Sequence, residues 1–172
     1  MSYGFQVLTV KNKILIASAI TVALVSTFLV KETLTAPKID CVNVYVDYGV
    51  LNNGETSEAC IEVEDGIDAM SAFNMHSLAI LGTDKYGLQI VCRVNSFPSG
   101  VDAIPVEGHE GYVERCTDMP AQFAYWALLV KRGSGSTAVW GWYDKGILDL
   151  DLDAGDSVAL VFTVNDEVKW PE

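Results

Sequence analysis

The sequence predicts an α+β domain, rich in strands and with one helix packed on the sheet, preceded by one N-terminal transmembrane helix. Three observations carry this prediction. Most apolar stretches alternate with polar residues at a period of two, which is typical of strands. Residues 67–82 change to a period of three to four, which is typical of a helix. Residues 14–30 form a run of seventeen residues without a charge, which is typical of a membrane span.

The uncharged run at residues 14–30, ILIASAITVALVSTFLV, would reach roughly 25 Å as a helix, near the lower limit for crossing a bilayer. Two lysines precede it, and no acidic residue occurs before Glu32. The positive-inside rule therefore places residues 1–13 in the cytoplasm and, after a linker at residues 31–40, residues 41–172 outside the cell. We predict a single-pass protein of the cell membrane with an extracellular C-terminal domain.

A cleaved signal peptide, which would make the domain a secreted one, is the alternative to an uncleaved anchor. Cleavage needs small residues at positions −3 and −1. Ala36 suits the second of these positions, but Leu34 then falls at the first. Lys31 and Glu32 also follow the apolar run directly, so an uncleaved anchor is favoured.

The chain is strongly acidic, with 23 Asp and Glu against 11 Lys and Arg and a net charge of −12 at pH 7. Two of the lysines precede the anchor, so residues 31–172 carry a net charge of −14. Such a domain repels phosphate backbones, and nucleic-acid binding is therefore not expected.

Four cysteines follow the anchor, at Cys41, Cys60, Cys92 and Cys116. An even number in an oxidising compartment predicts two disulfides, and the close cysteine pairs of a zinc site are missing. Three pairings are open at this point. We favour Cys41–Cys60 with Cys92–Cys116, because each pair closes a local loop. A disulfide that closes a loop of about 20 residues stabilises the folded state by about 3 kcal/mol.

The exported part begins with two predicted strands. Residues 41–49, CVNVYVDYG, alternate valines with polar residues. Residues 50–59 carry an Asn-Gly turn signal and predict a loop. Residues 60–66 alternate again and predict the next strand, which ends at an Asp-Gly pair.

Residues 67–82 predict the one helix of the exported part, with Asp65 at its start and Gly82 at its end. Apolar positions recur in it every three or four residues, at Ile67, Met70 and Phe73. Residues 88–97 form an apolar run typical of a central strand. Residues 98–120 contain three prolines and predict a long loop, pinned by its one cysteine; loops of this length are often functional.

Residues 124–132 and 138–146 predict two further strands joined by a GSGS turn. They hold the aromatic residues that we consider candidate ligand-binding groups: Tyr125, Trp126, Trp140, Trp142 and Tyr143. The period of two places Trp140 and Trp142 on one face of their strand and Tyr143 on the other. Aromatic rings at a surface bind flat rings, sugars or prolines. The alternative is that these rings build the core beside a disulfide.

The last predicted element starts in the aspartate-rich stretch GILDLDLDAGDSV, residues 146–158. A calcium loop starting at Asp149 needs Gly at position 6 and Glu at position 12, where this chain has Ala154 and Leu160. The leucines at 148, 150 and 152 alternate with aspartates, which predicts a strand with one acidic face, paired as a hairpin with residues 157–164. A weak divalent-cation site on the acidic face stays open.

Catalytic motifs are missing from the chain. His109 begins HEGYVE, which lacks the second histidine of H-E-x-x-H, and GSGS is a turn rather than a nucleophile elbow. Paired cysteines leave no thiol nucleophile. We therefore expect a protein that is not an enzyme; a glycan hydrolase that uses two of the many carboxylates is the least favoured alternative.

Several short motifs follow one another in an order that resembles the transcobalamin-like C-terminal domain family of bacterial and archaeal surface proteins. They are VNVYVDYG, GIDAMSAF, Tyr86-Gly87 before IVCRV, Tyr125-Trp126 and Gly155-Asp156, and they cover residues 41–164. The chain has NSFP where a cysteine-bearing subgroup has Gly after V-C-R-[IV]-x. The resemblance implies a small β-grasp-like domain. In transcobalamins the related domain covers one face of cobalamin, so the resemblance also implies a corrinoid as a candidate ligand.

The functional prediction is a membrane-anchored extracellular binding module. It would hold a small ligand, with a cobalamin-like corrinoid as one candidate, or a surface partner, between the Trp-bearing strands and the loop at residues 98–120. No bound metal or other cofactor is expected. The alternative is a structural or adhesive surface protein, stapled by disulfides, that binds no small ligand.

Overall fold

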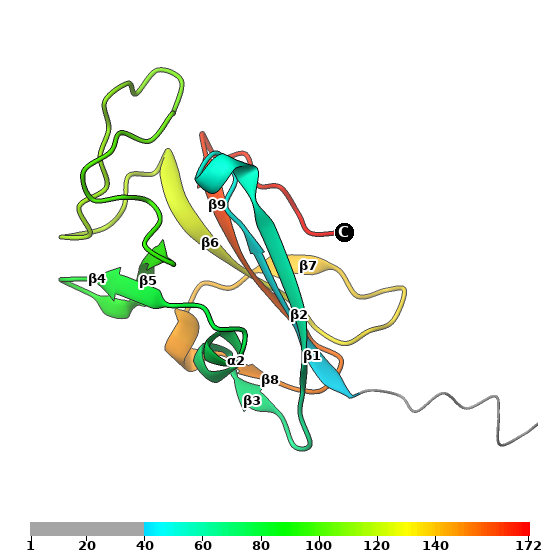
Figure 1. The fold of residues 1–172 in the computed structure, drawn as a ribbon. Coiled ribbons are helices and arrows are strands. Elements are labelled where there is room, and N and C mark those ends of the chain that lie inside the picture. The colour runs from blue at the N-terminus through cyan, green and yellow to red at the C-terminus, as the bar shows by residue number, and fades with distance from the viewer. Residues whose placement is uncertain (1–39) are drawn as a thin grey trace, which may run out of the picture. The chain divides into compact units, whose positions relative to one another are not determined.

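The structure is a computed structural model that describes residues 40–172. Residues 1–39, with the predicted anchor and nearly all of the predicted linker, lie outside the described residues. Within residues 40–172, no helix is long and apolar enough to cross a membrane. This part of the chain is an α+β fold made mostly of strands, with one α-helix (Figure 1). The predicted α+β class is therefore confirmed for the described residues.

The main sheet has five strands in the order β2-β1-β9-β6-β7. A hairpin of β1 (Cys41–Asp47) and β2 (Thr56–Glu62) forms one side of it. The last strand, β9 (Ser157–Val164), lies parallel to β1 and antiparallel to β6 (Ala124–Lys131). Strand β7 (Trp140–Trp142) completes the other side.

Alternation explains the first hairpin, because the three valines of β1, at 42, 44 and 46, are fully buried. Strand β2 starts four residues earlier than the sequence predicts, since Asp47 pairs with Thr56. The loop between them therefore spans only residues 48–55, and includes the 3-10 turn η1 (Asn52–Gly54). The predicted loop at residues 50–59 was wrong in its second half.

The predicted helix at residues 67–82 was right only in its middle. Helix α2 spans Ala69–Met75 and is capped by Asp68, whose carboxylate accepts from the Ser71 backbone N–H at 2.8 Å. It ends because Ser77 adopts a left-handed backbone, with φ at 62°, and the Leu78 N–H bonds back to the helix. Two short strands flank it: β3 (Ile67–Asp68) before and β4 (Ile80–Thr83) after.

The predicted central strand at residues 88–97 was also wrong in its place in the fold. Strand β5 (Gly87–Val94) pairs with β4 alone, as a separate two-stranded sheet. Its residues Val91 and Val94 are buried because they pack into the main hydrophobic core, rather than because strands flank β5 on both sides.

The predicted aspartate hairpin does not form. Residues Ile147–Asp149 make the 3-10 turn η2, and β8 (Asp151–Leu152) pairs with β3 instead of β9. Leu148 is therefore 52% exposed, whereas Leu150 and Leu152 are buried. The returning strand was predicted correctly at residues 157–164, but its partners are β1 and β6.

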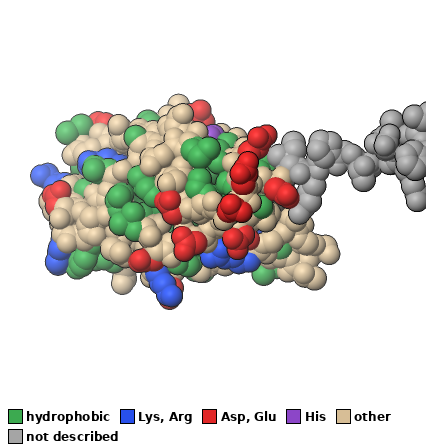
Figure 2. Space-filling view, turned by 90° about the horizontal axis from the view of Figure 1, so that it is seen from below, with side chains coloured by type: hydrophobic (Ala, Val, Ile, Leu, Met, Phe, Trp, Pro, Cys, Tyr) green, Lys and Arg blue, Asp and Glu red, His purple; other side chains and the backbone are tan. Residues whose placement is uncertain are grey.

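Acidic side chains gather on the face of the domain that is seen from below (Figure 2). The pairing of β3 with β8 sets Asp68 opposite Asp151, both exposed. The described residues nevertheless contain one group of three candidate metal ligands within 4.8 Å of one another, and it lies elsewhere, at Cys92, Glu114 and Cys116. Both sulfurs of that group are bonded to each other. Among residues 40–172, no group of this kind lies on the acidic face.

Strand β7 is much shorter than the predicted strand at residues 138–146. It pairs with β6 only over Leu129–Lys131, whereas β9 pairs with β6 along its whole length. The first half of β6 therefore has no strand beside it on the β7 side among the described residues. A cleft occupies this place.

Candidate binding cleft between β5 and β6

The cleft between β5 and β6 has a volume of about 520 Å³, within the usual range of about 300–1,000 Å³ for small-molecule sites. A smaller cavity of about 160 Å³ shares four of its lining residues and continues along β6 to β7. We call the two together the β5–β6 cleft. Its larger part is lined by Ile90, Val91, Met119, Pro120, Ala121, Gln122, Tyr125, Trp126 and Asp166.

Four of the five predicted site residues line this cleft. Tyr125 and Trp126 border both parts, and Trp142 and Tyr143 border the smaller one. Trp140 does not reach it. Its ring meets Tyr45 edge-on at a centroid distance of 6.1 Å, and the Lys131 ammonium lies 5.0 Å from its centroid.

Trp126 forms the fixed part of the cleft wall. It is 7% exposed and packs edge-on against Tyr48 and Phe162, with centroid distances of 5.5 and 5.3 Å. Its Nε1–H donates to the Phe97 carbonyl oxygen at 3.2 Å. The alternative interpretation, in which the aromatic residues build the core, therefore holds for Trp126.

Tyr125 and Trp142 supply rings at the surface of the cleft. Their centroids lie 6.3 Å apart with the planes tilted by 31°, and Trp142 is 50% exposed. The Tyr125 hydroxyl donates to Asp166 at 3.4 Å. Partial burial and the negative charge of Asp166 raise the pKa of Tyr125, so this phenol stays neutral at physiological pH.

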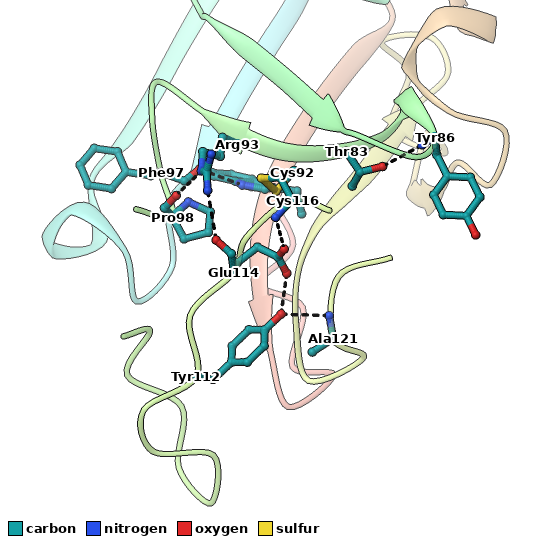
Figure 3. Close-up of a disulfide and its surroundings, with 11 residues drawn as sticks. Thr83, Tyr86, Cys92, Arg93, Phe97, Pro98, Tyr112, Glu114, Cys116 and Ala121 are labelled. Carbon is teal, nitrogen blue, oxygen red and sulfur yellow. Dashed lines mark hydrogen bonds between the residues drawn. A yellow bond between two sulfur atoms is a disulfide. The ribbon is translucent and has the colours of Figure 1, made fainter. Parts of the chain in front are cut away.

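The third wall comes from the long loop after β5, which the Cys92–Cys116 disulfide ties to that strand (Figure 3). The Cα atoms of the two cysteines are 5.6 Å apart. Arg93 adds two bonds to the same loop: its Nε donates to the Pro98 carbonyl at 2.8 Å and its Nη2 to the Glu114 carbonyl at 3.1 Å. The loop is therefore fastened at three points.

The buried carboxylate of Glu114 connects this loop to the wall of the cleft through hydrogen bonds. Glu114 accepts from the Cys116 backbone N–H at 2.6 Å and from the Tyr112 hydroxyl at 2.5 Å. The Tyr112 oxygen in turn accepts from the Ala121 N–H at 3.3 Å, beside Pro120 in the cleft wall (Figure 3). Neither Glu114 nor Tyr112 was predicted as a site residue, although an acidic residue two positions before a predicted half-cystine was the available signal.

Tyr112 is expected to ionise late in an alkaline titration. Burial, and then the hydrogen bond to Glu114, raise its pKa from 10.0 to about 12. Because the folded pKa is raised, the stabilisation is complete below pH 10 and is lost as the pH rises towards about 12. The pKa of Tyr125 is also raised, but less, so the latest component of the tyrosinate absorbance should be the one that disappears in Tyr112→Phe. A latest component that Tyr112→Phe leaves unchanged would contradict this assignment.

The lining of the β5–β6 cleft is apolar and aromatic, with Asp166 in the larger part and Asp144 in the smaller one. No lysine or arginine lines either part among the described residues. Such walls can bind apolar or aromatic groups and favour a positive charge. A second hollow of about 520 Å³, between β4 and residues 96–100, has no aromatic side chain in its lining.

No protein-family model matches the chain, and no curated protein or solved structure matches it.

Proposed function

We propose that residues 41–172 form an exported binding module, anchored to the membrane by residues 14–30, that holds a small ligand or a surface partner in the β5–β6 cleft. The observation that carries the proposal is the position of this cleft. It lies where the strand bearing Tyr125 and Trp126 meets the end of the long loop, at Met119 and Pro120.

The cysteines support export. The described residues hold two disulfides, Cys41–Cys60 and Cys92–Cys116, and no free cysteine. This is the pairing favoured from the sequence. Disulfides persist in oxidising compartments and are rare in the cytosol, so the pairing suits a domain outside the cell.

The strand order supports a β-grasp-like assignment, and with it the resemblance to transcobalamin-like C-terminal domains. A β-grasp sheet has a first hairpin, a helix that follows it, and a last strand parallel to the first in the middle of the sheet. The order β2-β1-β9-β6-β7, with α2 following the hairpin and β1 parallel to β9, suits this description.

A corrinoid is the small ligand that the resemblance suggests, and the cleft suits one that is covered on one side only. Tyr125 and Trp142 offer rings to a flat macrocycle, and Met119 offers an exposed apolar side chain. Asp144 and Asp166 favour a cation. We therefore expect cobinamide, which is cationic, to bind better than cobalamin, which carries a phosphodiester, and haem, with two carboxylates, to bind least.

Tryptophan fluorescence tests this ligand class. The full-length protein, in mild detergent, is titrated with cobinamide, cobalamin and haem, with free tryptophan as the control for absorption of light by the ligand. We expect saturable quenching at micromolar cobinamide and progressively weaker binding of cobalamin and haem. Flat titrations with all three would overturn the tetrapyrrole proposal and leave a surface partner as the ligand.

Two exposed methionines give a matched pair for locating the site. Met119 is 58% exposed at the cleft and Met75 is 59% exposed on α2. Met119→Ser should weaken the quenching affinity several-fold, because it removes apolar contact area from the cleft. Met75→Ser should leave the affinity unchanged. Equal effects of the two substitutions would place the ligand elsewhere.

A further inference from the structure

The walls of the β5–β6 cleft are strand edges. Three consecutive residues of β5, Gln89 to Val91, and four consecutive residues of β6, Tyr125 to Leu128, line its smaller part. Consecutive strand residues point to opposite faces, so what a run of them shares is the backbone edge. Among the described strands, β5 pairs only with β4, and β6 has no strand beside it on this side before Leu128, whose carbonyl accepts from the Tyr143 N–H.

The register of β6 shows which backbone groups face the cleft. The Tyr143 N–H donates to the Leu128 carbonyl at 2.9 Å, and Val130 pairs with Gly141, so even-numbered residues of β6 turn their backbone groups towards β7. The pairing of β6 with β9 continues without a register shift to Ala124. The N–H and C=O of Trp126 therefore point to the side on which the cleft lies.

The acidic lining of the cleft favours some extended peptides over others. The cleft is lined by Asp144 and Asp166 and by no lysine or arginine of the described chain, on a protein with a net charge of −12. A basic segment gains from this field, and an acidic one is repelled. Apolar side chains on alternate positions would meet Met119, Pro120 and Tyr125.

We infer that the occupant of the β5–β6 cleft is an extended, lysine- or arginine-bearing peptide segment of a surface partner, which pairs with the edge of β6 as an added strand. The inference rests on the proposed function, in which this cleft is the binding site. Main-chain bonds to Trp126 give the pairing its direction, and alternate side chains contact the apolar walls. Residues 124–127, the part of β6 without a neighbour on this side, span roughly 13 Å, which suits a segment of about four residues.

Three synthetic hexapeptides test the inference on the full-length protein in mild detergent. They are an alternating Lys-Val peptide, the Glu-Val peptide of the same length, and the Lys-Val peptide with N-methyl groups on one edge. We expect the Lys-Val peptide to bind saturably, and each of the others about tenfold more weakly or worse. Amide exchange at Trp126 should slow with the Lys-Val peptide alone. Equal binding of the methylated peptide, or unchanged exchange at Trp126, would overturn strand addition.

Neutral variants test the charge. Asp144→Asn with Asp166→Asn should weaken the Lys-Val peptide about threefold to tenfold, whereas Asp102→Asn with Glu167→Gln, exposed and outside the cleft lining, should not. Asn suits position 166, where φ is 59°. Equal effects of the two pairs would contradict a basic occupant.

The failures of the two proposals are distinguishable. Tetrapyrrole binding that Met119→Ser weakens, together with no binding of any peptide, would overturn the peptide and keep the binding module. If sedimentation shows a dimer, and the Trp126 amide is already protected from exchange without peptide, the occupant of the cleft is a second copy of the chain and the peptide proposal is overturned. No binding of peptides or tetrapyrroles, on a strict monomer, would overturn both proposals.

Discussion

Replacing Cys92 and Cys116 together by alanine is expected to abolish ligand binding in the β5–β6 cleft and to lower the free energy of unfolding by about 3 kcal/mol. The stability loss follows from the loop of 24 residues that the disulfide closes. The binding loss follows because the disulfide holds the loop that carries Met119 and Pro120 against β5. Thermal unfolding monitored by circular dichroism should shift down by roughly 10–15 °C.

The other disulfide provides a matched control. Cys41 and Cys60 close a loop of 19 residues, also with a Cα separation of 5.6 Å, so their replacement should cost nearly the same stability. They join β1 to β2, on the far side of the main sheet from β7, and neither lines the cleft. Binding below the melting temperature should therefore survive. A variant without Cys92 and Cys116 that still binds normally would contradict the role given to the loop.

Asp156→Ala is expected to destabilise the fold by about 2–4 kcal/mol, because three donors lose their acceptor at a buried position. The carboxylate, 7% exposed, accepts from Arg132 Nη1 and the Gly133 N–H, each at 2.7 Å, and from the Asp153 N–H at 3.1 Å. It thereby ties the end of β6 to the turn before β9. Urea unfolding at pH 7 measures the loss.

Acid titration gives the same carboxylate a second readout. Burial opposes ionisation of Asp156, but the bonds from Gly133, Asp153 and Arg132 outweigh it and hold the pKa below the ordinary value of 3.8. Because the folded pKa is depressed, the stabilisation is present above pH 3.8 and is lost as the pH falls through the folded value. Asp156→Asn should remove this part of the acid dependence. Exposed Asp151→Asn should not, and equal behaviour of the two variants would contradict the assignment.

Local patterns predicted the elements whose partners are near in sequence or whose periodicity is strict. The valines of β1 alternate and are all buried, and the favoured cysteine pairs each closed a loop of 19 or 24 residues. Tyr125 and Trp126 were proposed as candidate site residues because aromatic residues gather on two neighbouring predicted strands, and both line the β5–β6 cleft. These inferences needed no knowledge of distant contacts.

The other predictions were wrong because they depend on pairing between strands that are far apart in the sequence. Leu150 and Leu152 fit a strand, but β8 pairs with β3, more than eighty residues away, so Leu148 falls in a turn and is exposed. Helical periodicity predicted a helix over residues 67–82, but it does not reveal that Ser77 adopts a left-handed backbone, which ends the helix. The strand after it, β4, pairs with β5.

The cleft itself follows from how few residues of β7 pair with β6, and a sequence does not encode that length in any local pattern. Trp140 was grouped with the site residues because the period of two places it on the same strand face as Trp142. A β7 of the predicted length would have covered the edge of β6. Trp142 reaches the cleft beside Tyr125, whereas Trp140, two residues earlier on the same strand, packs on Tyr45.

Backbone amide chemical shifts of the full-length protein, recorded during titration with the Lys-Val peptide and with cobinamide, test the central claim most directly. If the β5–β6 cleft is the binding site, the changes should be confined to residues 89–91, 119–122 and 125–128 for whichever ligand binds. Changes centred on the β2 edge or on the acidic face at β3 and β8, with the cleft residues unaffected, would contradict it.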